Sequence, residues 1–212
     1  MSARRLVPLL VLLLAASGCA KATIYPYGGV TYVAPEGVQI DRVVLLPTNA
    51  GPGLQEYRRV ADDSLYSAIR QLRPDLDIIS ASECTRALGE EGLMDKLVEL
   101  LATYERTGVS NGDLLAELGA ALQAGHFLYV DLKYAQVSSK EWRLLEGLHT
   151  AEHQNLELVG RLWEASEGKL VWESSVGAKA SAGKDVFVTT LSRDLPDMIG
   201  VVAVSLASSF PR

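Results

Sequence analysis

Short apolar runs alternate with amphipathic stretches along most of the chain. Residues 42–47 form a nearly continuous apolar run that ends at a proline, as in a strand buried on both faces of a sheet. Residues 54–72 place apolar side chains at helical spacing up to a following proline, so we expect a helix there. A second short strand is expected at 76–79, and Ser82 can cap a short helix that runs through Leu88.

The middle of the chain predicts two further helices and a strand. Leucines recur on one face of residues 93–106, and the glycine at 108 suits the left-handed position beyond a helix end. Either Ser110 or Asn111 can cap the next helix, which we expect over 113–123. Residues 126–134 are rich in β-forming side chains and predict a strand.

The last third of the chain predicts a hairpin and a helix. Residues 138–154 are polar and indicate no clear element, whereas apolar and polar positions alternate over 156–163, as in a strand. A Glu-Gly turn then leads to a partner strand over 170–179. Residues 185–210 are mostly apolar and helical in pattern, and Pro196 interrupts them, so we expect a break or kink near Leu195.

This order of elements predicts an α/β fold. The order is β-α-β-α-α-β, followed by a β-hairpin and a C-terminal helix. Strands that are separated by helices pair in parallel, and a late hairpin extends the sheet in antiparallel fashion. We therefore expect an α/β sandwich of two or three layers with a mixed sheet, formed by one domain over residues 41–212.

The N-terminus has the pattern of an export signal. Two arginines precede an apolar run over residues 6–16. The run is too short for a membrane-spanning helix, which needs roughly 20 apolar residues. Its end, Ala-Ser-Gly-Cys at 16–19, resembles the lipobox at which bacterial prolipoproteins are lipidated and cut. The resemblance implies a signal peptide over 1–18 and acylation, with chains such as palmitate, at Cys19.

Charge and the residue after the cysteine indicate where the protein is located. Removal of residues 1–18 takes away two arginines and no acidic residue, so the formal charge falls from −6 to −8. An acidic body does not adhere to anionic lipids by itself, but more than one acyl chain suffices for stable attachment. Lipoproteins retained at the inner membrane usually carry aspartate at the position of Ala20. The resemblance therefore implies the outer membrane, with the domain facing the periplasm. The same acidity argues against nucleic acid as a partner.

Residues 19–40 are expected to be a lipidated tether. They contain glycine, proline and tyrosine without a helical period, so we interpret them as a partly extended linker between the bilayer and the domain. Three tyrosines in this segment, Tyr25, Tyr27 and Tyr32, either pack on the domain or lie at the membrane interface. The sequence leaves both possibilities open.

The second cysteine has no partner for a disulfide within the chain. The sequence contains two cysteines, and acylation of Cys19 would leave Cys84 alone. We expect Cys84 to be a small buried apolar residue. A reactive thiol and a disulfide between subunits are the alternatives.

One serine motif resembles a hydrolase signature. Residues 108–112 read Gly-Val-Ser-Asn-Gly and match G-x-S-x-G, in which Ser110 would be the nucleophile. That mechanism needs a strand before the serine and a helix after it. Because a helix is expected on each side, we interpret 108–112 as a joint between two helices.

One histidine motif resembles a metal site. Residues 149–153 match H-x-x-E-H, and on a helix His149 and His153 would lie one turn apart and could share a zinc ion, with Glu152 as base. The motif lies in a polar segment before a strand, and no third ligand on a second helix is evident. We therefore expect a solvated loop or a short helix end, and no metal or cofactor.

Three stretches of the domain carry a family resemblance. They are Arg42–Pro47, Glu117–Ala120 with Gly125–Val130, and Leu158–Trp172. They resemble the periplasmic lipoprotein domains related to the curli-secretion lipoprotein and to the amino-terminal domain of the Tol-system β-propeller protein. In these domains a first strand ends in proline, a helix supplies Leu-Gly-Ala before a central strand, and a late hairpin carries an acidic residue, glycine and then tryptophan. The resemblance covers roughly residues 41–210 and implies a non-enzymatic module in envelope assembly or secretion.

The leading hypothesis is an outer-membrane lipoprotein whose periplasmic domain binds other envelope proteins. It has no expected catalytic, cofactor-binding or metal-binding residue, its partners are unknown, and a homo-oligomer is left open. The alternatives are a periplasmic hydrolase that uses Ser110 or the His149/His153 pair, and a small-ligand carrier with a closed apolar cavity. A pore made by this protein alone is not expected, because 138–154 offers no long strand pair with a continuous apolar stripe.

Overall fold

A mixed seven-stranded sheet organises the fold. The computed structural model describes residues 23–34, 39–144, 147–181 and 195–211. Within them the strands lie in the order β1-β7-β6-β5-β2-β4, and β3 pairs with β5 away from this path. The strands are β1 (Thr23–Val33), β2 (Arg42–Leu45), β3 (Asn49–Ala50), β4 (Asp77–Ile79), β5 (His126–Leu144), β6 (Gly147–Glu164) and β7 (Leu170–Ser181).

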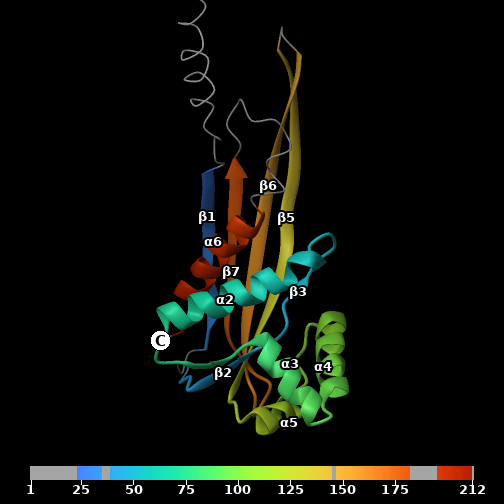
Figure 1. Cartoon of the computed structure of the whole chain (residues 1–212), viewed down its shortest axis with the longest axis vertical. Helices are drawn as coiled ribbons and strands as arrows, with labels where there is room; N and C mark the ends of the chain where they lie inside the picture. The colour runs from blue at the N-terminus through green and yellow to red at the C-terminus, as the bar shows by residue number, and fades with distance from the viewer. Residues whose placement is uncertain (1–22, 35–38, 145–146, 182–194, 212) are drawn as a thin grey trace, which may run out of the picture.

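Helices fill the connections between the parallel strands and follow the last strand (Figure 1). They are the short 3-10 helix η2 (Gln55–Tyr57), α2 (Arg58–Leu72), α3 (Ala81–Glu90), α4 (Met94–Thr107), α5 (Gly112–Leu122) and α6 (Leu195–Ser208). Strand β2 pairs in parallel with β4 and with β5, whereas β5, β6, β7 and β1 pair in antiparallel fashion. The structure thus confirms the predicted α/β class, with parallel core strands, a late antiparallel hairpin and a C-terminal helix.

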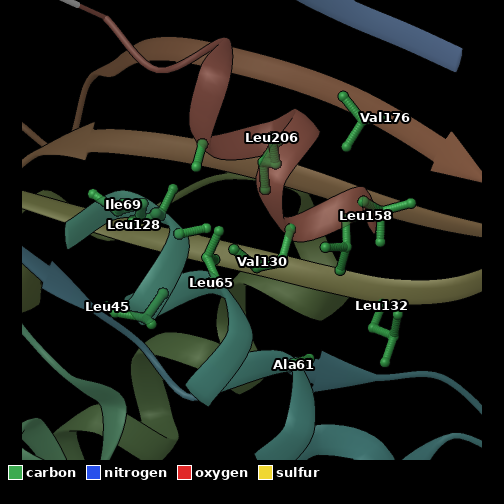
Figure 2. Packing of buried hydrophobic residues seen from close by; sticks show 14 of the residues in the cluster. Leu45, Ala61, Leu65, Ile69, Leu128, Val130, Leu132, Leu158, Val176 and Leu206 are labelled. Carbon is green, nitrogen blue, oxygen red and sulfur yellow. The ribbon is translucent and has the colours of Figure 1, made fainter. Parts of the chain in front are cut away.

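One face of the sheet is covered by α2 and α6. Leu128 and Val130 of β5 and Leu158 of β6 point into this core, where apolar side chains of both helices meet them (Figure 2). Helix α6 lies close to β6 because Gly160 has no side chain. A Cβ atom there would lie 3.0 Å from Cδ2 of Leu206.

The other face is covered at one end only. The residues that alternate with the first set, Phe127, Tyr129 and Trp163, pack against α3, α4 and α5 in a second core. Figure 1 shows these three helices gathered at one end of the sheet. The sandwich therefore has three layers at that end and two layers where only α2 and α6 cover the sheet, so both predicted layer counts apply to part of the molecule.

The segment expected to be a tether contains an edge strand. Residues 23–33 form β1 and pair along β7, and Ile24 packs against the main core. Proline and glycine are depleted in strands, so their presence concealed this strand in the sequence. Pro26 is compatible with β1 because an edge strand leaves one side of its backbone unpaired. The sheet thus begins before Asp41, where we expected the domain to start.

The polar segment 138–154 belongs to a long hairpin. Strands β5 and β6 contain 19 and 18 residues, and their pairing runs from His126 opposite Glu164 to Leu144 opposite Gly147. Pairing between β6 and β7 ends at Gln154, so the hairpin projects beyond the rest of the sheet (Figure 1). Our expectation of a loop or short helix end was wrong, because the segment forms a long strand pair. Backbone pairing extends β5 and β6 beyond the core. Their sequence there does not have to alternate between apolar and polar residues.

Helix α6 begins where a break was expected. Its first residue is Leu195 and Pro196 lies in its first turn, where an absent N–H costs no hydrogen bond. The predicted helical part over 185–194 lies outside the described residues. In the described part of the chain, no helix combines the length and the hydropathy needed to cross a bilayer.

Helix α3 is capped two residues earlier than expected. The Ser80 side chain, rather than that of Ser82, accepts a hydrogen bond from the backbone N–H of Glu83 at 3.2 Å. The Glu83 carboxylate in turn accepts from the Ser80 backbone N–H at 2.9 Å, which completes a capping box.

Candidate functional site

The predicted acylation site lies outside the described residues. Cys19 and the signal peptide over 1–18 therefore stay predictions. Four residue steps separate Cys19 from Thr23, the first residue of β1. Four residue steps of fully extended chain span at most about 14 Å, so acylation of Cys19 would keep β1 near the bilayer.

Ser110 lies in the joint between α4 and α5. Gly108 ends α4 in the left-handed conformation, with φ of 70°, and the Asn111 side chain accepts from the Leu114 N–H at 3.2 Å to cap α5. The Ser110 hydroxyl donates to the backbone carbonyl of Gly168, in the turn between β6 and β7. The serine thus connects the joint between α4 and α5 to a hairpin turn. This agrees with the interpretation of 108–112 as a joint between two helices. No strand delivers it to a nucleophile elbow.

His149 and His153 lie on β6, not on a helix. They pair with Trp142 and Ser138 of β5. Four steps along a strand separate two Cα atoms by about 13 Å, compared with about 6 Å on a helix, so the shared-ion geometry of the motif is lost. Among the described residues, no group of three or more His, Cys, Asp or Glu side chains fits a metal ion.

A ladder of polar side chains crosses the sheet on the face that α3–α5 leave open. Asn49 donates to Asp131 at 3.0 Å, and Nη1 of Arg161 donates to the second oxygen of Asp131 at 2.6 Å. Nε of Arg161 donates to Glu173 at 2.7 Å, and the Thr31 hydroxyl donates to the other Glu173 oxygen at 3.0 Å. The ladder therefore joins β3, β5, β6, β7 and β1 at one level, and all four carboxylate oxygens are hydrogen-bonded.

Arg161 also borders the aromatic end of the second core. Its guanidinium lies 5.9 Å from the ring centre of Tyr104, whose ring meets those of Trp163 and Tyr129 edge-on at 4.6 and 5.2 Å. Burial opposes the charged form of Arg161, but Tyr104 and the two carboxylates more than offset this and raise its pKa. A permanently charged arginine that holds both carboxylates leaves neither free as a general base.

Sequence analysis did not identify this ladder. Alternation over 156–163 does put Arg161 on the same strand face as Trp163, and a charged residue beside a buried tryptophan was the one available signal. Its partners Asp131, Glu173 and Asn49 come from other strands, and their spacing along the chain has no motif.

A crevice opens at the carboxyl ends of the parallel strands β2 and β4. Its volume is about 410 Å³, and its walls come from the starts of α2 and α3. The lining residues are Pro47, Arg59, Asp62, Asp63, Ser80, Ala81, Ser82 and Thr85. Asp62 accepts from the Thr48 N–H at 2.9 Å, and burial raises the pKa of its carboxyl. The crevice is open and has both polar and apolar lining, unlike the closed apolar cavity that a carrier would need.

Two further titratable groups, one buried and one half-buried, lie away from these surfaces. Cys84 is a free thiol in the second core, fully buried, and burial raises its pKa to about 12. This confirms the expected apolar role and leaves the thiol protonated. His126, at the start of β5, was not singled out in the sequence. Burial lowers its pKa, and its buried Nδ1 has no hydrogen-bond partner within the described residues.

Comparison of the sequence with protein-family profiles and with curated proteins found no significant match. Among solved structures, the chain is similar to the PelC dodecamer from Paraburkholderia phytofirmans, with 12% identity, a TM-score of 0.39, and coverage of 88% of this chain and 99% of that one. Lipoprotein GNA1162 from Neisseria meningitidis gives 12% identity, a TM-score of 0.37, and coverage of 77% of this chain and 98% of that one. The LpoB C-terminal domain from Salmonella enterica gives 12% identity, a TM-score of 0.37, and coverage of 68% of this chain and 86% of that one. The structural neighbours thus include a bacterial lipoprotein, at scores too low to transfer a function.

Proposed function

We propose that the protein is a lipid-anchored component of the bacterial outer membrane whose periplasmic domain binds other envelope proteins and performs no catalysis. The observation that carries this proposal is the lipobox that ends in Cys19, placed directly after a charged and apolar export signal. Ala20 after the cysteine favours the outer membrane. The resemblance to periplasmic lipoprotein domains supports the same assignment.

The open face of the sheet supports binding rather than chemistry. The side chains around Arg161 are polar and partly exposed, yet they are paired with one another. Such a surface presents a fixed pattern of charge to a partner without unpaired groups that a reaction would require. Lys133, beside this ladder on β5, is exposed and close to Glu157, which extends the charged pattern along the sheet.

Both enzyme alternatives lack a converging set of residues in the described part of the chain. Ser110 is bonded to a backbone carbonyl, and the two histidines of the H-x-x-E-H motif are spread along a strand. Among the described residues, the crevice at β2 and β4 does not support the carrier alternative either, because it is open and its lining is both polar and apolar.

Acyl labelling tests the anchor. Cells that express the full-length chain are fed an alkyne fatty acid, and the labelled protein is detected after membrane separation. The wild-type chain and Cys84→Ala should be labelled equally and be found with outer membranes, whereas Cys19→Ala should be unlabelled. Equal labelling of Cys19→Ala, or label only in inner membranes, would reject the proposed attachment.

Site-specific photo-crosslinking tests the binding face. A photoreactive residue at Lys133 should give a discrete protein adduct in intact envelopes, because this position lies on the open face. The same residue at Val98, an exposed position on α4, is the matched control and should give none. Adducts of equal yield at both positions would argue against a specific surface around Arg161.

A further inference from the structure

Strand β1 exposes an unusual set of side chains. Five of the nine exposed large apolar or aromatic residues in the described part of the chain lie on this one strand. They are Tyr25, Tyr27, Val30, Tyr32 and Val33. No residue of β1 is charged, although the mature chain would carry a formal charge of −8. Exposed apolar and aromatic side chains concentrated on one strand indicate a contact site.

The backbone of β1 is poorly suited to pairing with a strand of another protein. Pro26 lacks an N–H, Gly28 has a φ of 95°, and the pairing register with β7 shifts between Val30 and Tyr32. Proline, irregular backbone and bulges are the devices that protect an edge strand from strand addition. The contact is therefore made by the side chains of β1 rather than by its free backbone edge.

The tyrosines of β1 are presented on a fixed backbone. The Tyr27 ring lies over Gly177 of β7, where a Cβ atom would be 2.3 Å from Cζ of the tyrosine. The Thr31 hydroxyl donates to Glu173, which ties β1 to the Arg161 ladder. Tyr25, at the end nearest Cys19, is 57% exposed. Tyr25 thus projects into solvent, whereas Tyr27 packs on the sheet at Gly177 and keeps part of its ring exposed.

The length of the hairpin limits how the anchored domain can stand on the membrane. Thr23 of β1 pairs with Ser181 of β7, and the β5–β6 hairpin continues past this level from Ser138 to Leu144, which is about 20 Å. The hairpin sequence is polar and charged, so its entry into hydrocarbon is costly. Cys19 reaches at most about 14 Å beyond Thr23. If the strands stood upright with the hairpin tip at the bilayer surface, this reach would be too short to bring Cys19 to the membrane. The domain has to tilt, and tilting toward the β1 edge moves the tip aside.

We propose that the exposed tyrosines of β1 lie in the headgroup region of the bilayer that carries the acyl anchor. This inference rests on the proposed acylation of Cys19. Tyrosine rings are enriched at membrane–water interfaces because one end is apolar and the other is a hydrogen-bonding hydroxyl. The absence of charge lets β1 approach anionic lipids that repel the rest of an acidic domain. The protein then lies with its β1 edge on the membrane and the opposite edge, with α3 and α4, toward the periplasm.

Fluorescence quenching by brominated lipid tests the placement of β1. The full-length acylated protein is reconstituted into phospholipid vesicles with and without brominated acyl chains, as wild type, Tyr25→Trp and Val98→Trp. Trp163 and Trp172 are buried, and the wild-type protein supplies the background of all native tryptophans. The control Val98 is 60% exposed on α4, which packs with α3 and α5 away from β1. The emission added by Tyr25→Trp should fall by more than about half in brominated vesicles, and that of Val98→Trp should not change.

Each other result has a defined meaning. If Tyr25→Trp is unquenched by lipid but open to aqueous iodide, β1 faces solvent and the inference is wrong. If it is protected from both quenchers, another protein, such as a second copy of this chain, covers β1 and the inference is also wrong. If wild type does not co-float with vesicles any better than Cys19→Ala, the proposed anchor itself fails. Co-flotation with an unquenched Tyr25→Trp rejects only the placement of β1.

Discussion

Nε of Arg161 on β6 donates to Oε2 of Glu173, directly opposite on β7, at 2.7 Å. The same guanidinium holds Asp131 on β5, so one side chain links three adjacent strands. The pair lies where α3–α5 cease to cover the sheet, at the border between the aromatic core and the open face. This position makes Arg161 important for both the integrity of the sheet and the charge pattern of its open surface.

Replacement of Arg161 by alanine should lower the free energy of unfolding by about 2 kcal/mol, because two partly buried carboxylates lose their shared partner. Chemical denaturation measures this change. Arg59→Ala is the matched control, since Arg59 is highly exposed and lies 3.7 Å from Asp63, and its effect should be within about 0.5 kcal/mol. Equal effects of the two variants would show that the ladder is not a structural clamp.

Replacement of Gly168 by alanine should lower the free energy of unfolding by more than about 2 kcal/mol. Its φ is 66°, and a Cβ atom would lie 2.6 Å from Cα of Gly112, so the hairpin turn would be pushed off the α4–α5 joint. Gly92→Ala has a similar φ of 69° but no atom within 4 Å, so it should cost only about 1 kcal/mol. Thermal or urea unfolding of both variants separates backbone strain from the clash. A Gly168→Ala effect no larger than that of Gly92→Ala would contradict the tight contact.

Cys84 should be unreactive in the native protein. Burial raises the pKa of its thiol to about 12, so almost no thiolate is present at neutral pH. In the Cys19→Ala background, a thiol reagent should label Cys84 only after denaturant is added. Fast labelling without denaturant, or a disulfide-linked dimer under oxidising conditions, would restore the reactive or intersubunit alternatives.

The half-buried imidazole of His126 should make stability depend on pH. Burial lowers its pKa in the folded state, and Glu164 and Asp41 oppose this only in part. The unfolded chain then binds a proton more readily, so the free energy of unfolding should fall as the pH drops below the ordinary histidine pKa of about 6.5. His126→Gln removes this contribution, and its unfolding free energy should fall less than that of wild type between about pH 7 and pH 5. Parallel curves for the two proteins would contradict a lowered pKa.

Local pattern predicted most of the elements that face a core. The apolar run containing Val43 and Val44 is a parallel strand because it is buried on both faces, and the helical period around Leu65 reflects packing of α2 on the sheet. Two strand regions were missed where no such requirement applies. Strand β1, with Pro26 and Gly28, lies at an edge, and the outer part of the β5–β6 hairpin has no core beside it.

The candidate site depends on contacts that local pattern does not encode. Arg161 and Asp131 are 30 positions apart and meet only because β5 and β6 pair in one register. In contrast, the interpretation of 108–112 as a helix joint depended on neighbouring residues alone, and Gly108 and Asn111 have the expected capping roles. The Cys19 motif is also local, and it stays a prediction because it lies outside the described residues.

The most direct test of the account is the mass of the N-terminal peptide from the full-length protein purified from membranes. If the chain is processed at Cys19, trypsin cleavage after Lys21 releases the peptide Cys-Ala-Lys. The account predicts that this peptide carries covalently bound acyl chains on Cys19 and that no peptide from residues 1–18 remains. A purified protein that begins at another residue, or that carries an unmodified Cys19, would contradict it.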